Sequence, residues 1–273
     1  MPVAPVAIVR RGFGETMRKD AWWATPLAVF IGLSAFVGYS TWAAFQNAYY
    51  TSGPYLSPFY SPVLFVSPGD SAGLVHAWFG VKPDWIPAFL PFSPALLILP
   101  FPAFFRFTCY YYRGAYYKSF WADPPACAVG EPRKKYLGEH SFPLVFQNVH
   151  RYFMWAAVVF LGFLSYDVWL AVWFTNTATG QMEFGIGLGT LILFVNVILL
   201  SCYTLGCHAF RHVIGGFFNE VSKHPACDFG YACSSALNGK HQLFAWCSII
   251  SVMSSDVYVR LCSMGYITDL RIL

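Results

Sequence analysis

The strongest constraint on this chain is its long stretches without a charged side chain. No Asp, Glu, Lys or Arg occurs between Asp20 and Asp70, and none occurs between Glu183 and Arg211. Hydrophobic residues make up 57% of the 273 residues and charged residues only 11%, which is too apolar a composition for a soluble domain of this size. A helix of about 20 mainly apolar residues crosses a bilayer. The chain is therefore predicted to be a membrane protein.

Five stretches are long and apolar enough to span the membrane. They are residues 24–46, 91–112, 144–174, 184–212 and 241–265. The second is interrupted by Pro94, Pro100 and Pro102, so we expect it to be kinked. These features predict an all-α integral membrane protein, in which residues 24–265 form a bundle of five transmembrane helices.

Lys and Arg residues near the spans predict the orientation, because they concentrate on the cytoplasmic side. On one side only Lys82 and Arg271 flank the spans. The other side carries Arg10, Arg11, Arg18, Lys19, Arg113, Lys118, Arg133, Lys134, Lys135, Arg211, Lys223 and Lys240. We predict a multi-pass protein of the inner (plasma) membrane with a cytoplasmic N-terminus and an outer C-terminus. The net charge of +4 is then explained by the topology rather than by binding of nucleic acid.

The segments outside the spans divide between the two sides. A cytoplasmic arm is predicted over residues 1–23 and an outer tail over residues 266–273. The long outer loop 47–90 is expected to cap the outer face. The inner loops are predicted at residues 113–143 and 213–240, and the first of them mixes charges, prolines and aromatic residues as a docking surface for a cytosolic partner does.

Histidines near the cytoplasmic ends of three spans are the main chemical signal. They are His150, His208, His212 and His241. His208 and His212 are spaced i, i+4, and the same face carries Ser201 and Thr204, so this stripe is predicted to face the bundle interior. Ionisable groups inside a bilayer are costly and need a partner or a function. Imidazoles from facing helices can hold haem iron or another redox metal, or can hydrogen-bond across helices.

The cysteines leave the identity of such a centre open. No histidine lies in the outer half of a span, so at most one inner centre is expected. Cys207 and Cys202 share the inner layer with Cys109 and Cys247. Two His and two Cys form the ligand set of a Rieske-type [2Fe–2S] centre, although buried cysteine is often only a small hydrophobe. Spacing alone supports one haem b equally well.

Quinone chemistry needs hydrogen-bond donors, an apolar slot and a route for protons. Arg151, Tyr152, Trp155 and Arg211 provide donors at the inner end and are the predicted quinone-binding residues. The two arginines also fit simple positive-inside anchoring. Asp167 lies nearer the outer face and is predicted to transfer protons at a second quinone site, or else to be a hydrogen-bonded buried carboxylate.

Three segments resemble a known family. TCYYYRGAYYKSFWADPPACAVGEP (108–132), FPLVFQNVHRYFMW (142–155) and GCHAFRHVIGG (206–216) are similar to the single-chain membrane anchor of actinobacterial succinate dehydrogenase. The resemblance implies a flavoprotein subunit and an iron–sulfur subunit on the cytoplasmic face, and menaquinone as the acceptor. It also implies an embedded Rieske-type [2Fe–2S] cluster, for which one haem b is the alternative.

These observations lead to one functional prediction with one rival. The chain is predicted to pass electrons from a cytosolic iron–sulfur subunit through an embedded centre to menaquinone. The predicted metal ligands are His150, His208, His241, Cys207 and Cys202. The rival is a structural anchor without a metal, with quinone bound at the subunit interface. The chain contains no flavin-binding fingerprint, so we expect it to be catalytically inert without its partners.

The Lys and Arg distribution predicts which side of the membrane each loop occupies. A reporter that is active only in the cytoplasm, fused after Lys135, should be active. Activity of a periplasm-dependent reporter at the same position would contradict the predicted topology.

Overall fold

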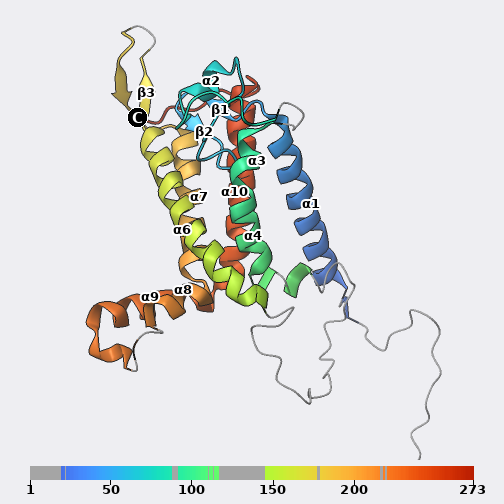
Figure 1. Cartoon of the computed structure of the whole chain (residues 1–273), viewed down its shortest axis with the longest axis vertical. Coiled ribbons are helices and arrows are strands. Elements are labelled where there is room, and N and C mark those ends of the chain that lie inside the picture. The colour runs from blue at the N-terminus through green and yellow to red at the C-terminus, as the bar shows by residue number, and fades with distance from the viewer. Residues whose placement is uncertain are drawn as a thin grey trace, which may run out of the picture.

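The structure is a computed structural model that describes residues 20–21, 23–87, 92–109, 111–112, 114–116, 145–176, 179–215, 218 and 220–273. Most of the N-terminal arm 1–23 and of the inner loop 113–143 therefore lies outside the described residues. Within them, four helices are long and apolar enough to cross a membrane. They are α1 (Ala24–Gln46), α6 (Val145–Leu170), α7 (Leu188–Leu205) and α10 (His241–Ser263). Figure 1 shows them running along one common direction.

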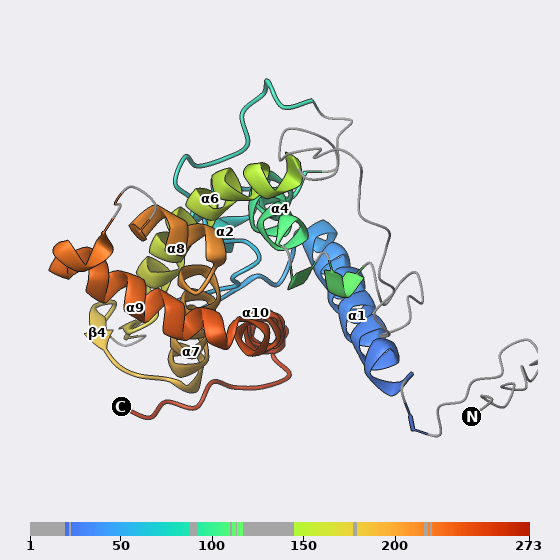
Figure 2. The same cartoon turned by 90° about the horizontal axis from the view of Figure 1, so that it is seen from below.

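The second predicted span is divided into two short helices, as its prolines predict. Helix α3 (Pro94–Ile98) and helix α4 (Pro100–Thr108) each begin with a proline, which fits the first turn because proline has no backbone N–H to donate. The two follow one another along the bundle (Figure 1), and α4 packs against α6 (Figure 2). Neither is long enough alone to count as a span, so the fifth crossing stays a prediction.

The fourth predicted span and the loop after it need correction. The helix expected over residues 184–212 ends at Leu205, and α8 (His208–Gly215) begins after a turn at Gly206. A side chain at Gly206 would meet the Cys202 carbonyl at 2.7 Å and the Leu237 side chain at 2.9 Å. The predicted loop 213–240 also contains a short 3-10 helix, η1 (Val221–Lys223), and α9 (Pro225–Gly239). Figure 1 shows α8 and α9 lying across one end of the bundle.

Residues 47–87, here called the cap, fold over the opposite end, as predicted for the long outer loop. The cap contains the hairpin of β1 (Thr51–Ser52) and β2 (Tyr55–Leu56) and the single turn α2 (Ser71–Leu74). A second hairpin, β3 (Trp173–Thr175) with β4 (Met182–Phe184), joins α6 to α7. Apart from these two small hairpins, the described residues form a mainly helical fold, as predicted. The cap is well packed, since Tyr60, Val63 and Val66 are fully buried.

Inside the cap, a tyrosine and an aspartate are directly bonded. The Tyr50 hydroxyl donates to the Asp70 carboxylate, and the Tyr50 ring stacks on Tyr60 with 4.2 Å between the centroids. Burial, with the Asp70 carboxylate next in effect, raises the pKa of Tyr50 well above its usual range. The hydroxyl therefore keeps its proton and its role as donor.

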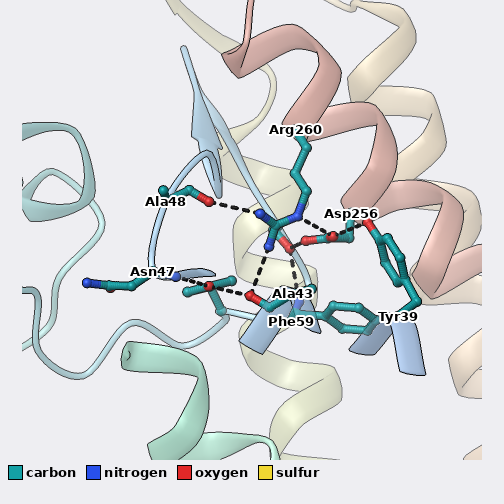
Figure 3. Close-up of polar contacts among 9 residues, drawn as sticks. Tyr39, Ala43, Asn47, Ala48, Phe59, Asp256 and Arg260 are labelled. Atoms are coloured by element: carbon teal, nitrogen blue, oxygen red, sulfur yellow. Dashed lines mark hydrogen bonds and ion pairs between the residues drawn. The ribbon is translucent and has the colours of Figure 1, made fainter. Parts of the chain in front are cut away.

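A buried ion pair joins the cap to α1 and α10. Arg260 Nε lies 2.7 Å from Asp256 Oδ2, and both side chains are almost completely buried. The same carboxylate accepts from the Tyr39 hydroxyl of α1 at 2.5 Å and from the Ser57 hydroxyl of the cap. Figure 3 shows Tyr39 and Arg260 approaching Asp256 from two different helices.

The Arg260 guanidinium completes this junction. Its Nη1 donates to the Ala48 carbonyl at 2.9 Å, and its Nη2 donates to the Ala43 carbonyl at 3.1 Å (Figure 3). These carbonyls lie at and just beyond the last turn of α1, where the helix leaves acceptors without an intrahelical partner. One side chain of α10 therefore holds the end of α1 in place.

The two ends of the described fold lie far apart. The chain enters α1 at the end that carries α8 and α9, and the C-terminal residue lies beside the β3–β4 hairpin at the opposite end (Figure 1). An odd number of crossings requires this arrangement. Which end faces the cytoplasm stays a prediction.

Removing Asp256 should destabilise the fold strongly, because it leaves the Arg260 charge buried and unpaired. We expect Asp256→Ala to lower the free energy of unfolding by about 3–5 kcal/mol, measured by thermal unfolding in detergent. The matched control is Glu220→Ala, which breaks an exposed ion pair with the same 2.7 Å separation and should cost about 0–1 kcal/mol. Equal effects of the two substitutions would contradict this assignment.

Candidate functional site

His150 lies on the buried face of α6 and contacts two other elements. Its Nδ1 is 2.9 Å from the Thr108 hydroxyl at the end of α4, and its Nε2 is 3.0 Å from the Cys207 sulfur. The Thr108 hydroxyl donates to the Phe104 carbonyl at 2.7 Å, so it accepts from His150 Nδ1–H. This arrangement leaves Nε2 without a proton and directs its lone pair at the sulfur.

A second pair of the same kind joins α4 to α10. Cys109, the residue after α4, places its sulfur 3.7 Å from Nε2 of His241, the first residue of α10. Cys109 is almost fully buried and His241 is half-buried. His241 Nδ1 is buried and has no hydrogen-bond partner among the described residues. One ring nitrogen is therefore available at this position.

Aromatic rings connect the two pairs into one layer. The Phe105 ring stacks on His150 with 4.9 Å between centroids, and the Tyr203 ring stacks on His241 at 4.8 Å. Phe105 and Tyr203 then meet edge to face at 5.5 Å. Cys109 and Cys207 belong to the same buried cluster, together with Phe105 and Tyr203. We call Cys109, His150, Cys207 and His241 the Cys–His layer.

The local structure explains why these donors can meet. Cys109 follows the last turn of α4 in an extended conformation, and Cys207 lies in the turn between α7 and α8. His241 opens α10 directly after α9 ends. At such positions the chain changes direction, so side chains can point across the bundle rather than along their own helix. Only His150 comes from within a continuous helix.

Arg106 of α4 lies next to this layer. Its guanidinium donates to the Tyr112 hydroxyl at 2.5 Å and to the Ser248 hydroxyl at 3.0 Å, and it lies 4.8 Å from the centre of the Tyr203 ring. Ser248 is seven residues into α10, about 10 Å along the axis from His241. The charge therefore lies inside the bundle. Among the described residues, no carboxylate forms an ion pair with it.

His208 and Cys202 do not belong to the layer. His208 and His212 are exposed on α8, where their Nε2 atoms are 3.1 Å apart. Their i, i+4 contact was predicted correctly, but the stripe shared with Thr204 was wrong, because the turn at Gly206 separates α8 from α7. Cys202 is half-buried on α7 one turn before that break.

The predicted quinone-binding residues lie outside the bundle interior. On α6, His150 and Met154 face inward, so Arg151, Tyr152 and Trp155 point away from the core, with Tyr152 78% and Trp155 51% exposed. Arg211 of α8 lies instead over the Tyr231 ring of α9, at 5.6 Å. An apolar cavity of about 1150 Å³ lies beside Arg106 between α1, α4 and α6, and none of these four residues lines it. Their role stays a prediction.

Asp167 accepts a hydrogen bond from the Ser61 hydroxyl of the cap. This is the hydrogen-bonded carboxylate that the sequence allowed as the alternative to proton transfer. Proton transfer by Asp167 stays a prediction.

Some residues of the site were missed by sequence reasoning. Cys109 was noted for its depth but not chosen as a ligand, and Thr108, Arg106 and Tyr203 were not considered. Arg106 gave the clearest unused signal, because it is the one charged residue in the proline-broken span 91–112. Thr108 and Tyr203 carried no comparable signal, since their importance depends on contacts between helices.

Comparison with known proteins identifies the family. Residues 24–265 match the family described as actinobacterial succinate dehydrogenase subunit SdhC. The chain belongs to this family. It is also similar to a chain in a solved structure of the Mycobacterium smegmatis Sdh1 complex in the apo form, with 44% identity, 97% of each chain covered and a TM-score of 0.78. No curated protein matches the sequence.

The SdhC family consists of membrane-anchor subunits of succinate dehydrogenase, so this chain is part of an enzyme complex. Its donors do not form a ready-made metal site: in the described part of the chain, no three His, Cys, Asp or Glu side chains are grouped closely enough to hold an ion. The Cys–His layer instead consists of two Cys–His pairs.

Replacing Thr108 should show that its hydroxyl orients His150. Thr108→Val keeps the size of the side chain but removes the hydroxyl that accepts from the buried His150 Nδ1–H. We expect this change to lower the free energy of unfolding by about 1–3 kcal/mol in detergent. Thr108→Ser retains the hydroxyl and should stay closer to the wild type. If serine proves no better than valine, the hydrogen bond does not hold the ring.

Proposed function

We propose that this SdhC-family chain passes electrons from a cytosolic iron–sulfur subunit through one embedded centre to menaquinone. In the overall reaction, succinate loses two electrons and two protons to give fumarate, and the quinone gains two electrons and two protons to give the quinol. The single observation that carries the proposal is the Cys–His layer, which brings two thiols and two imidazoles from four parts of the chain into one region of the bundle.

The donors fit a Rieske-type [2Fe–2S] centre held by Cys109, Cys207, His150 and His241. Their chemistry matches the two-cysteine, two-histidine ligand set of that centre. Two further features support the fit: the unprotonated His150 Nε2 and the unpartnered His241 Nδ1. When bound, such a centre transfers one electron at a time, at a potential raised by its histidine ligands. Relative to the predicted ligand set, this proposal keeps Cys207, His150 and His241 and replaces Cys202 and His208 with Cys109.

One haem b between His150 and His241 is less well supported. The Phe105 and Tyr203 rings fill the space between the two imidazoles, each stacked flat on one of them. A porphyrin would have to displace both rings.

A structural anchor without a metal is the second candidate. The observation that favours it is the arrangement of the donors as two hydrogen-bonded pairs, without three ligands in one group among the described residues. In that case the thiol and imidazole groups would satisfy one another, and quinone would bind at the subunit interface. The iron content of the purified complex separates the two candidates.

The partners are proposed to be a flavoprotein subunit and an iron–sulfur subunit. The similar Mycobacterium smegmatis protein is part of an Sdh1 complex, which supports assembly with other subunits. The end of the bundle that carries α8 and α9 is proposed to face the cytoplasm, because Arg151, Arg211, Lys223 and Lys240 all lie there. It is also the end nearest the Cys–His layer, so a docked iron–sulfur subunit would deliver electrons over a short distance.

Spectroscopy on cysteine variants tests the proposed ligand set. The purified complex should give an EPR signal beyond those of the soluble subunits, and no haem bands in a reduced-minus-oxidised visible spectrum. Cys109→Ser and Cys207→Ser should each abolish the additional signal, whereas Cys202→Ser should keep it. Cys233→Ser, on the exposed side of α9, is the matched control and should also keep it.

Other results would overturn parts of the proposal. A haem b band that survives Cys109→Ser and Cys207→Ser would favour haem. A complex whose iron is fully accounted for by its soluble subunits would leave the structural anchor. Loss of the signal in Cys202→Ser, with retention in Cys109→Ser, would restore the ligand set predicted from sequence.

A further inference from the structure

A group of exposed apolar side chains lies in the second half of the cap. Residues 74–85, here called the aromatic segment, have the sequence LVHAWFGVKPDW. Val75, Phe79 and Trp85 are each more than two-thirds exposed, and Trp78 is about half exposed. Single exposed hydrophobic residues are common on proteins, but several large ones within one short segment indicate a surface that contacts something other than water.

The aromatic segment packs against the side of a membrane span. The Trp78 ring lies 5.4 Å from the Phe163 ring and 6.0 Å from the Tyr166 ring of α6, measured between centroids. Phe163 precedes Leu170, the last residue of α6, by about 10 Å along the helix axis. Because α6 is long and apolar enough to cross the bilayer, Trp78 lies at the level of the membrane rather than beyond it.

The face of α6 beside Trp78 is an exterior face of the bundle. Tyr166 is 46% exposed, and Val159 and Trp169, which share its face at helical spacing, are each 58% exposed. Figure 2, seen along the bundle, shows the cap chain reaching out past α4 and α6, on the side away from α7 and α10. The exposed surface of the aromatic segment therefore continues the lipid-facing surface of α6.

The backbone of the aromatic segment is paired where it runs beside residues 63–66 of the cap. Three of its N–H groups donate to three carbonyls at 2.8–3.0 Å: Trp78 to Val63, Phe79 to Leu64 and Lys82 to Val66. Non-helical chain is costly at membrane depth when its backbone polar groups have no partner. These hydrogen bonds lower that cost for the aromatic segment.

We infer that the aromatic segment is inserted into the bilayer leaflet on the cap side, where Val75, Phe79 and Trp85 contact lipid acyl chains just below the headgroups. The cap then has a second role besides covering the end of the bundle, because it anchors the chain laterally in the membrane. This role concerns the lipid surface and does not depend on the embedded centre or on electron transfer.

The chemistry of the aromatic segment fits the boundary between headgroups and acyl chains. Tryptophan concentrates at this boundary because its ring is apolar and its indole N–H can donate a hydrogen bond. Lys82, the one Lys or Arg in the cap, has its Nζ 5.5 Å from the centre of the Phe92 ring. A lysine beside apolar surface can keep its stem there while its charge reaches a phosphate. A water-soluble partner would have to pass the headgroups to reach Trp78.

Photocrosslinking of the purified complex in nanodiscs of phosphatidylcholine and phosphatidylglycerol tests the inference. The residue p-benzoylphenylalanine, which reacts with nearby C–H bonds when illuminated, replaces Phe79 or Trp85. The matched control carries it in place of Met182, which is 60% exposed but lies in the β3–β4 hairpin that extends past the helix ends in Figure 1. Phospholipid adducts should be about tenfold or more as abundant at Phe79 and Trp85 as at Met182, because acyl chains surround an inserted segment.

Two results of the crosslinking would overturn the inference. Equal yields of lipid adduct at Phe79, Trp85 and Met182 would place the aromatic segment in water. Adducts to a second copy of this chain, or to another subunit, in place of lipid adducts would show that protein covers this surface.

Hydroxyl-radical labelling of the wild-type complex covers the case in which a variant fails to assemble. The radicals are generated in water, so a side chain within the bilayer is shielded from them. Each rate is taken relative to that of the same residue in the unfolded chain. In nanodiscs, Trp85 should be oxidised about fivefold or more slowly than Met182 on this relative scale, although Trp85 is the more exposed of the two in the chain. Equal relative rates would refute insertion.

Discussion

The hydrocarbon interior of a membrane offers no water to hydrogen-bond a polar group, and the fold follows from this constraint. A helix satisfies its own backbone N–H and C=O groups except at its ends. In this chain, side chains form hydrogen bonds to some of the groups at those ends. Arg260 donates to the Ala43 and Ala48 carbonyls at the end of α1, and its charge is balanced by Asp256. Asp256 in turn receives hydroxyl groups from Tyr39 and Ser57. Each of these buried polar groups is thus satisfied by groups from another element, which fixes α1, α10 and the cap relative to one another.

The same constraint explains the Cys–His layer. Cys109, Cys207 and His241 sit where helices stop or start, and His150 is oriented by the hydroxyl of Thr108 at such an end. Thiols and imidazoles placed together can satisfy one another in pairs, and they are also soft metal ligands. A region that is stable as two hydrogen-bonded pairs can therefore present a complete donor set when iron is delivered. This would give the chain a way to fold before the proposed centre is assembled.

Sequence reasoning identified the features that depend on local pattern. The charge-free stretches predicted the four long helices, and the prolines predicted the division between α3 and α4. The positions of histidines near the span ends singled out His150 and His241 as candidate ligands. It failed where a residue matters because of a distant neighbour. At Gly206, where α7 ends, the missing side chain leaves room for Leu237 of α9. Spacing does not reveal this contact, and the error placed His208 in a span. Cys109 was undervalued for the same reason, since its partner His241 is 132 residues away.

The junction at Arg260 has a consequence for biosynthesis. The carbonyls at the end of α1 leave the ribosome more than 200 residues before the guanidinium that binds them. During translation, α1 therefore enters the bilayer without its final neighbour, and the cap cannot close over Asp256 until α10 is inserted. Until then, α1 is also not held in the position in which it lines the cavity between α1, α4 and α6. In this chain the first helix to be synthesised is among the last to reach its final position. A nascent chain arrested before α10 therefore lacks both the closed cap and the complete cavity.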